Sequence, residues 1–289
     1  MNYRHAYHAG NFADVMKHIV LMLVVESLLR KSKPFRVIDT HAGIALYDLT
    51  AEEAQRTGEW RRGIGRLTQR LMGTSQSEIP SAILRYVNLV RGYNGDGDLT
   101  HLTHYPGSPA LARQMLRPQD RLLVNELHPE DCATLKQHFR RDRQVKVLEL
   151  DGWTAIKSSL PPRERRGVIL VDPPFEEINE FDRLIKALTD AVSRFATGIY
   201  LLWYPLKDRI ATAQFKEKLL ATGIRRLMTA ELLVASDEQG ERLFGSGLVL
   251  HNPPYGLEGD LVNVLSGLEI LLSDGPAACS SVEVLRGEA

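Results

Sequence analysis

The chain has 289 residues, of which 44% are hydrophobic and 25% are charged, and its 36 basic side chains balance 36 acidic ones. Zero net charge provides no overall field that attracts nucleic acid, and two cysteines cannot make a disulfide framework or a cysteine-rich metal cluster. The polar start lacks a signal-peptide core, and the longest apolar stretch, 19–25, is too short to span a bilayer. We therefore expect a cytoplasmic protein that does not engage a membrane.

The charged residues are nevertheless unevenly placed along the chain. Six lysines and arginines face two acids in residues 1–36, and five arginines face one acid in 56–70, whereas six acids face one base from residue 255 onward. The basic half can therefore contact phosphates while the acidic end balances the sum. An ordinary solvated surface of mixed charge is the alternative interpretation.

The first predicted element is a helix that begins after Asn11 and runs to about Arg30. Asn11 is a good N-cap residue, and apolar residues recur at helical spacing behind it. The segment before it, 3–11, is rich in rings, cations and polar groups, which is unlike packing filler. Its histidines and His18 match no zinc-binding spacing, so we expect no metal.

A first strand, 35–39, ends at Asp39 and is followed by Thr40-His41-Ala42-Gly43. This turn is a plausible cofactor loop, but it lacks the glycine fingerprint of dinucleotide-binding folds. The next clear strand begins about eighty residues later, although a strand-to-strand crossover needs only about thirty residues. Residues 49–105 are therefore predicted to form a helical insertion, whose arginines are candidates for contacting RNA.

After the insertion, strands and helices alternate regularly. This alternation predicts an α/β fold with a doubly wound, mostly parallel, Rossmann-like sheet. The main domain would consist of residues 1–48 and 106–272, and residues 273–289 would form a loosely ordered tail. The seven predicted strands are 35–39, 121–126, 145–150, 168–172, 198–204, 225–235 and 247–251.

The most informative strand ends in the motif Asp172-Pro173-Pro174-Phe175. Four aliphatic residues precede it and predict a strand buried on both faces, which the prolines stop because they lack an N–H. Asp172 and the Pro173 carbonyl can accept hydrogen bonds from an NH2 group, and the Phe175 ring can stack on a planar base. The motif predicts methylation of a nucleobase amino group, although the same residues can also simply close a strand.

Acidic residues end four of the predicted strands: Asp39, Glu126, Asp151 and Asp172. The carboxyl ends of parallel neighbours share one edge, where such folds bind ligands. An acid after the second strand commonly accepts hydrogen bonds from ribose hydroxyls, which suits Glu126. Asp151, with Trp153 close by, can accept one from an adenine amine. A single such acid is usually a turn-former, but four on one edge predict a cofactor site.

This combination is typical of methyltransferases that use S-adenosylmethionine and act on adenine N6. Over nearly its whole length, the chain resembles the ribosomal RNA large subunit methyltransferase J family, which methylates an adenine N6 in 23S ribosomal RNA. Taken together, the motifs that carry this resemblance are highly specific. They are Tyr3-Arg4-His5, His8-Ala9-Gly10-Asn11, Lys17-His18, Asp39-Thr40-His41-Ala42-Gly43, Tyr105-Pro106-Gly107-Ser108-Pro109, Glu126-Leu127-His128-Pro129, Asp151-Gly152, Asp172-Pro173-Pro174-Phe175 and Leu202-Trp203-Tyr204-Pro205.

The resemblance implies a substrate and cofactor motif in residues 1–18 and makes Asp172 the catalytic acid, with Pro173 and Phe175 beside it. Phe175 stands where the family more usually has tyrosine, so its ring can stack but a hydroxyl contact is lost. The residues expected against the RNA are Tyr3, Arg4, His5 and Lys17. The implied contacts with S-adenosylmethionine come from His18, His41, Ser108, Glu126, Asp151, Gly152 and Asp172.

The expected partner is 23S ribosomal RNA, as naked or early-assembly RNA, and the expected enzyme is a monomer without a metal. A DNA adenine-N6 methyltransferase is one alternative, because the motif at Asp172 does not separate DNA from RNA. A non-catalytic RNA-binding protein on a methyltransferase fold is another. The intact set of acids at the strand ends argues against the second alternative.

Overall fold

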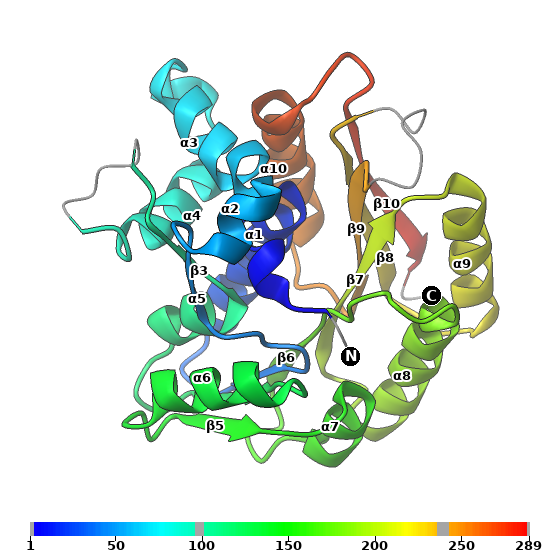
Figure 1. Ribbon diagram of the computed structural model, residues 1–289. Coiled ribbons are helices and arrows are strands. Elements are labelled where there is room, and N and C mark those ends of the chain that lie inside the picture. Colours follow the sequence, from blue (N-terminus) through cyan, green and yellow to red (C-terminus); the bar gives the residue numbers. More distant parts are fainter. Residues whose placement is uncertain (1–2, 96–100, 236–242, 288–289) are drawn as a thin grey trace.

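The structure is a computed structural model that describes residues 3–95, 101–235 and 243–287. It contains ten helices longer than one turn and ten strands in these ranges (Figure 1). The helices are α1 (Phe12–Leu29), α2 (Glu52–Thr57), α3 (Ile64–Met72), α4 (Ser81–Arg91), α5 (Ser108–Met115), α6 (Pro129–Phe139), α7 (Gly152–Ser159), α8 (Glu180–Arg194), α9 (Arg209–Ala221) and α10 (Leu257–Leu272). The strands are β1 (Arg36–Asp39), β2 (Leu46–Asp48), β3 (His104–Pro106), β4 (Arg121–Asn125), β5 (Val145–Leu148), β6 (Gly167–Val171), β7 (Ile199–Leu206), β8 (Leu227–Leu233), β9 (Gly245–His251) and β10 (Cys279–Arg286). Three short 3-10 helices are η1 (His5–Tyr7), η2 (Glu59–Arg62) and η3 (Gln76–Glu78).

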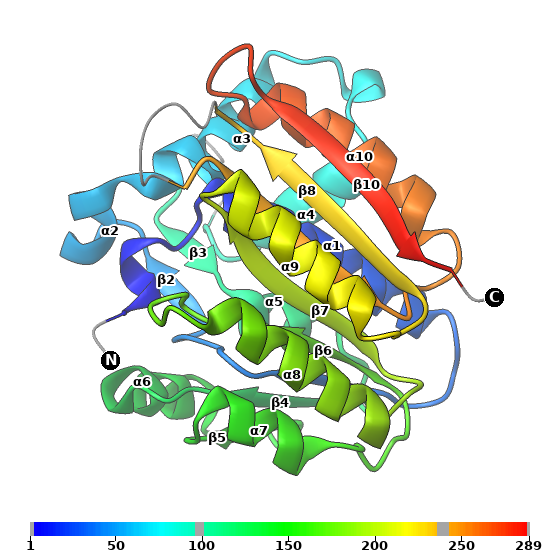
Figure 2. The same cartoon turned by 90° about the vertical axis from the view of Figure 1, so that its right-hand side faces the viewer.

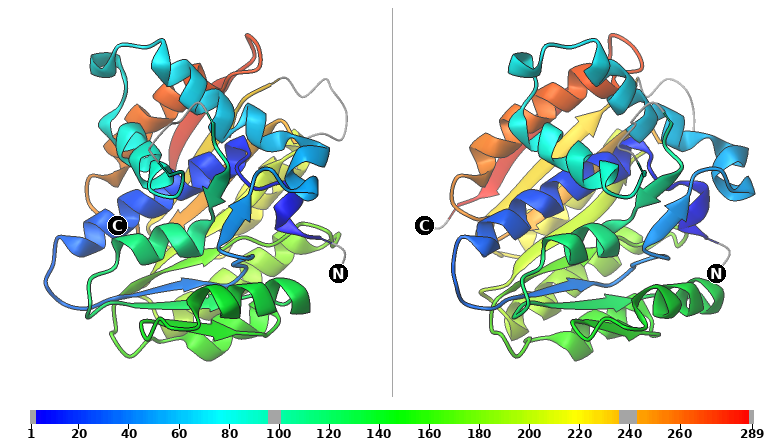
Figure 3. Two further views of the ribbon diagram at one scale, coloured as in Figure 1. Left: turned by 60° about the vertical axis from the view of Figure 1, so that its left-hand side comes forward. Right: turned by 90° about the vertical axis from the view of Figure 1, so that its left-hand side faces the viewer.

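Eight strands form the main sheet in the order β10-β8-β9-β7-β6-β1-β4-β5. The five strands from β7 to β5 are parallel, and β9, β8 and β10 join by antiparallel pairs. Helices α7, α8 and α9 cover one face, and α1, α5 and α10 cover the other (Figures 2 and 3). The predicted doubly wound, mostly parallel α/β fold is confirmed.

Strand β1 lies at the point where the strand order reverses. It pairs with β4 on one side and β6 on the other, so the chain leaves β1 and β6 in opposite directions. Loops that separate at such a point leave a crevice at the carboxyl ends of the strands. All five residues of β6 are buried, as the aliphatic run predicts, and Asp172 follows directly at this crevice.

The predicted count of seven strands is wrong by one, because residues 279–286 form β10. This strand pairs antiparallel with β8 and lies at the edge of the sheet opposite β5 (Figure 2). The prediction of a loosely ordered tail over 273–289 is therefore wrong for this part, while 288–289 lie outside the described residues. Two of its residues, Val282 and Leu285, pack against the hydrophobic core.

The segment predicted as an insertion contains α2, α3 and α4, and 96–100 lie outside the described residues. Strands β2 and β3 pair antiparallel at its base, with Tyr47 opposite Tyr105. Its buried side chains Leu67, Ile83 and Tyr86 belong to the same hydrophobic cluster as α1 and the sheet. The segment therefore shares the main core instead of building its own.

Helix α1 carries polar side chains deep into the fold. Asn11 caps it as predicted, since its Oδ1 accepts a hydrogen bond from the Asp14 N–H at 2.9 Å. Asp14, Lys17 and His18 are all buried although they are ionisable. Buried charges need partners, so the first turns of α1 are where a network is expected.

No helix in the described ranges has the length and apolar character that a membrane span requires.

Strand β7 is tied to β8 across the intervening strand β9. The Tyr204 hydroxyl donates to Glu231 Oε1 at 2.6 Å, and Lys216 Nζ lies 2.8 Å from the same oxygen. Tyr204 and Glu231 both stand opposite Gly247 of β9. A Cβ at Gly247 would lie 2.2 Å from the Tyr204 ring, so only glycine lets the ring pass over β9.

Removing the Tyr204 hydroxyl tests this tie. A hydrogen bond to a charged group contributes about 1.5–3 kcal/mol. Because Lys216 still pairs with Glu231, we expect Tyr204→Phe to lower the free energy of unfolding by about 1.5 kcal/mol, near the bottom of that range. Urea denaturation measures the difference. Tyr255→Phe, at a side chain that is 98% exposed, is the matched control and should leave stability unchanged. Equal stability of all three proteins would contradict the tie.

Candidate active site

Two cavities meet at Asp172. The large cavity has a volume of about 470 Å³ and the small cavity about 280 Å³. The large cavity extends toward η2, β7 and the end of α10, and the small cavity toward the ends of β4 and β5. The residues that line both are Tyr3, His5, Asp172, Pro174 and Glu176.

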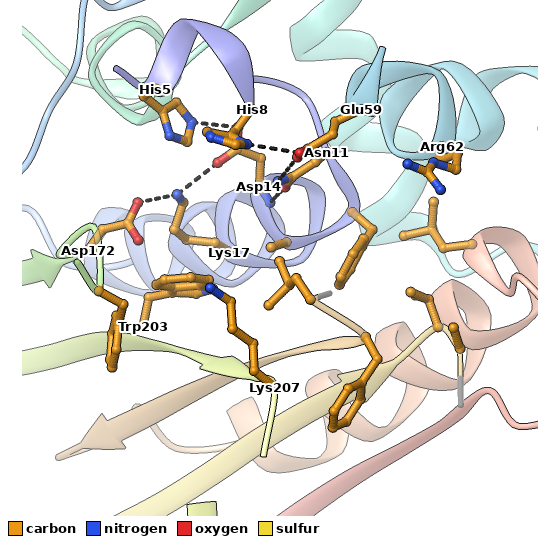
Figure 4. Close-up of a pocket in the computed structure, with 18 of the residues that line it drawn as sticks. His5, His8, Asn11, Asp14, Lys17, Glu59, Arg62, Asp172, Trp203 and Lys207 are labelled. Atoms are coloured by element: carbon orange, nitrogen blue, oxygen red, sulfur yellow. Dashed lines mark hydrogen bonds and ion pairs between the residues drawn. The ribbon is translucent and has the colours of Figure 1, made fainter. Parts of the chain in front are cut away.

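Lys17 bridges two carboxylates beneath this junction. Its Nζ lies 2.8 Å from Asp14 Oδ1 and donates a very short hydrogen bond to Asp172 Oδ2 (Figure 4). Burial alone would lower the pKa of Lys17, but Asp14 and Asp172 outweigh burial and raise it above its usual value. The side chain is therefore a buried ammonium ion that fixes the position of Asp172.

The N-terminal segment folds over the same network. His5 Nε2 lies 2.9 Å from Asp14 Oδ2, and its Nδ1 lies 2.9 Å from the Tyr3 hydroxyl. The Tyr3 ring stacks on His8, with 5.4 Å between ring centroids and 7° between planes. Burial would raise the pKa of Asp14, but His5 and Lys17 outweigh burial and hold it well below the usual range. Asp14 is thus the anion on which the segment and Lys17 converge.

Phe175 is held in an uncommon backbone conformation at the large cavity. Its φ is 53°, which lies in the left-handed region that residues other than glycine rarely adopt. Its ring meets Trp203 edge-on at 5.6 Å between centroids and Phe181 at 5.1 Å. Such strain persists where surrounding contacts hold it and clusters at functional sites. The ring lines the cavity close to Asp172, while Pro173 is buried.

The small cavity is shaped by Glu126 and by the start of α7. The two carboxylate oxygens of Glu126 accept hydrogen bonds from the Gly43 and His128 N–H groups, both at 2.8 Å. Asp151 caps α7 by accepting from the Thr154 N–H at 3.1 Å. Backbone donors therefore fix Glu126 and Asp151 in place, and both side chains face the cavity.

His41 and Gly152 form the floor of the small cavity. A Cβ at Gly152 would lie 2.3 Å from His41 Nε2, so the imidazole fits only because residue 152 is glycine. Burial lowers the pKa of His41 to about 4, and the ring is therefore neutral at physiological pH. It meets Trp153 edge-on at 5.7 Å, and the Arg183 guanidinium lies 5.0 Å from the centre of the Trp153 ring.

The lining of the small cavity is strongly acidic. Arg183 is the only lysine or arginine among the described residues of the lining, and a neutral His41 adds no positive charge. His5 also lines the cavity, and although burial would lower its pKa, Asp14 outweighs burial and raises that pKa. Within the described ranges, no group of three or more histidine, cysteine or acidic side chains is arranged to hold a metal ion. An acidic cavity of this kind suits a cationic ligand. The acids that line it are Glu126, Asp131, Asp151, Asp172, Glu176, Glu177 and Glu180.

Sequence comparison decides the family. The model of a family described as "Ribosomal RNA large subunit methyltransferase D, RlmJ" matches residues 32–282. The chain is 43% identical over 268 residues to ribosomal RNA large subunit methyltransferase J of Escherichia coli, covering 93% of this chain and 92% of that protein. The corresponding protein of Haemophilus influenzae is 43% identical over 265 residues, with 92% of each chain covered. The chain belongs to the ribosomal RNA large subunit methyltransferase J family.

A solved structure agrees with this membership of the methyltransferase J family. Protein LPL1258 from Legionella pneumophila is 33% identical and superposes with a TM-score of 0.85. The match covers 96% of this chain and 98% of that one. The same architecture therefore extends over nearly the whole chain. The predicted family is confirmed, and the chain is a methyltransferase of that family.

Most of the predicted site residues lie together. Tyr3, His5, Lys17, Asp172 and Phe175 line the large cavity. His41, Glu126, Asp151, Gly152 and Asp172 line the small cavity. Residues far apart in sequence thus converge on one junction, as the pattern of acids at strand ends predicts.

Three predicted site residues have side chains turned elsewhere. His18 is buried with its Nδ1 2.8 Å from the Tyr105 hydroxyl, and the Ser108 hydroxyl donates to Asp39 Oδ2 at 2.6 Å. Arg4 pairs with Asp131 at 2.9 Å instead of facing the large cavity. None of the three belongs to the lining of either cavity, and the predicted catalytic residue Pro173 is buried and lies outside both linings as well. His18, Ser108 and Arg4 instead each provide a hydrogen-bond or ion-pair partner to a buried polar side chain outside the cavity surface or at its edge.

The sequence prediction missed several residues that line the large cavity. Trp203 lies inside a motif of the resemblance, but no role was assigned to it. Glu59 binds His8 and Asn11. Its position as the single acid among the five arginines of 56–70 could have indicated a specific role. Arg62 is one of the insertion arginines that were predicted as candidates for contacting RNA, whereas Lys207 carried no signal beyond its charge, because its place in the cavity depends on tertiary structure.

The neutral state of His41 predicts how stability depends on pH. The unfolded chain protonates this imidazole below about pH 6.5, whereas the folded protein resists until about pH 4. The unfolded state therefore binds more protons in this window, and stability falls as the pH is lowered from 6.5 to 4, by at most about 3 kcal/mol.

We expect His41→Asn to lose less stability than the wild type over this window, with parallel curves above pH 7. Urea denaturation at several pH values measures both curves. Curves that stay parallel from pH 7 down to pH 4 would contradict the neutral state of the half-buried His41.

Proposed function

We propose that this methyltransferase transfers a methyl group from S-adenosylmethionine to the N6 atom of an adenine in 23S ribosomal RNA. In this proposal the small cavity holds the cofactor and the large cavity holds the target base. The observation that carries the proposal is the position of Asp172, which lines both cavities where they meet. We further propose a cytoplasmic monomer that acts on naked or early-assembly RNA.

The small cavity has the donors and charges that S-adenosylmethionine requires. When bound, the cofactor supplies a methyl group on a positively charged sulfonium, and the acids of the lining favour a cation. Glu126 keeps acceptor capacity for ribose hydroxyls beyond its two backbone bonds. Asp151 can accept from the adenine amine of the cofactor, beside the rings of His41 and Trp153.

The large cavity has the size and surface for a flipped nucleoside. Its volume falls within the range of about 300–1,000 Å³ that is usual for small-ligand sites. Pro174, Phe175 and Trp203 provide apolar surface at the side of Asp172. Enzymes that modify a base take it out of the stack and bind it against aromatic side chains, and the Phe175 ring offers such a surface.

The residue types fit the chemistry of an exocyclic amine. The N6 lone pair of adenine is delocalised into the ring, so the amine is a poor nucleophile. The Asp172 carboxylate and the Pro173 carbonyl can accept its two N–H groups and favour a pyramidal, more nucleophilic nitrogen. Lys17 holds Asp172 Oδ2 and leaves Oδ1 to accept from the amine. Fixed orientation then brings the nitrogen in line with the methyl group.

Asp172→Ala tests the catalytic assignment. We expect the rate of methyl transfer to 23S ribosomal RNA to fall by about 10²–10⁴-fold, the range for a positioned acid–base group. Radioactive methyl transfer to in vitro transcribed RNA measures the rate, and circular dichroism confirms folding. Asp182, which is exposed and pairs with Lys218, offers a control. Asp182→Ala removes an equal charge at a residue that lines neither cavity. A folded Asp172→Ala protein with wild-type turnover would refute the assignment.

Gly152→Ala tests the cofactor assignment of the small cavity. The added Cβ must displace His41, and we expect affinity for S-adenosylhomocysteine to fall at least about tenfold, or about 1.4 kcal/mol. Isothermal titration calorimetry measures this affinity directly. Gly259→Ala in α10 is the control, since a Cβ there meets no atom within 4 Å. Unchanged affinity in Gly152→Ala would place the cofactor elsewhere.

A further inference from the structure

The five arginines of residues 56–70 differ in what their guanidinium groups contact. Arg56 lies over the Tyr7 ring at 5.9 Å, and Arg61 lies over the Trp60 ring at 5.4 Å. Arg61 also donates to Gln55. These two arginines pack against their own neighbourhood.

Arg66 and Arg70 hold the end of helix α10. Arg66 donates to the Leu272 and Ser273 carbonyls and pairs with Asp274 at 3.0 Å. Arg70 donates to the carbonyl of Ile270 at 2.8 Å and to that of Ser273 at 3.2 Å. The last carbonyls of a helix have no partner within it, so these arginines satisfy a structural need. Arg66 also lines the large cavity, but its guanidinium is engaged by these partners.

Arg62 is the remaining member of the group, and it lines the large cavity. It is half-buried, and no acid, carbonyl or ring partner is found for its guanidinium among the described residues. Lys207, which follows β7, lines the same cavity and is likewise unpaired within the described ranges. Figure 4 shows the two cations on opposite walls, Arg62 from the helical segment and Lys207 from the end of the strand.

The acids of the large cavity are largely engaged with other partners. Lys17 pairs with Asp14 and Asp172, and Asp274 pairs with Arg66. Glu59 binds His8 at 2.9 Å. Glu176 lies at the junction with the small cavity, where a cationic cofactor would neutralise it. Arg62 and Lys207 are therefore cations of this lining for which the described residues supply no ion-pair partner.

We propose that Arg62 and Lys207 bind the phosphates of the RNA backbone on the two sides of the target adenosine. This proposal rests on the proposed function for the identity of the base. A base that reaches Asp172 leaves its flanking phosphates at the mouth of the cavity. A guanidinium fork matches two phosphate oxygens, and an ammonium acts as a point charge. Both are phosphate positioning residues and carry no sequence information.

The test compares three double variants on in vitro transcribed 23S ribosomal RNA. Arg62→Gln with Lys207→Gln removes both charges, and Arg62→Lys with Lys207→Arg retains them. Arg30→Gln with Lys33→Gln is the matched control. These two exposed cations precede β1 and therefore lie near the amino ends of the parallel strands, away from the cavities. RNA affinity is measured across a range of salt concentrations, together with kcat and KM for RNA and the affinity for S-adenosylhomocysteine.

Each phosphate contact with a single strand contributes about 0.7 to the slope of log affinity against log salt. For two lost contacts we expect the slope of the glutamine variant to fall by about 1.4, and KM for RNA to rise on the order of tenfold or more. Affinity for S-adenosylhomocysteine should not change. The charge-retaining variant and the control should keep the wild-type slope, and thermal unfolding shows that all variants fold.

A glutamine variant that folds and keeps the wild-type salt slope would overturn the phosphate contacts, even if the wild type methylates the RNA. A wild type that binds the RNA without methylating it would overturn the proposed function, while a reduced slope in the variant would still support the phosphate contacts. A wild type that does not bind the RNA would overturn both.

Discussion

The buried ammonium of Lys17 is the interaction on which the rest of the site depends. An unpaired charge in this position would cost several kcal/mol, so Lys17 requires both Asp14 and Asp172. Asp14 in turn binds His5 and the Gly10 N–H. One network thus fixes the end of β6, the first turns of α1 and the N-terminal segment. Removing one partner leaves an unpaired buried charge. The free-energy cost of that charge exceeds the stabilisation that the intact pair provides.

Charge also separates the two ligands of the proposed reaction. The small cavity presents many acids, and one of its two histidines, His41, stays neutral because burial lowers its pKa to about 4. The large cavity carries cations at its outer part and apolar surface near Phe175. A sulfonium prefers the acidic lining of the small cavity, while Arg62 and Lys207 offer a polyanion two cations that have no ion-pair partner among the described residues. Asp172 belongs to both because the methyl group has to pass between them.

Sequence reasoning reached the elements whose signals are local. The aliphatic run before Asp172 and the cap at Asn11 each follow from one strand or helix, and the structure places them as expected. Of the four acids at strand ends, Glu126, Asp151 and Asp172 line the small cavity, whereas Asp39 is buried against Ser108. Pairing choices are not local. Neither the contact of His18 with Tyr105 nor that of Arg4 with Asp131 can be read from spacing, because the partners lie far away in sequence. Strand β10 was missed for the same reason, since its stability comes from β8.

The inserted segment has a structural role in the site that its helices alone would not suggest. Gly10 has a φ of 79°, and its carbonyl accepts from the Ile64 N–H at 2.8 Å, while a Cβ at Gly63 would lie 2.0 Å from the same oxygen. Two glycines therefore let the backbones of the N-terminal segment and the insertion touch. Glu59 strengthens the contact by binding His8 and Asn11. The insertion thus anchors the start of α1, and through it Lys17 and Asp172, while the same few residues carry Arg62 into the large cavity.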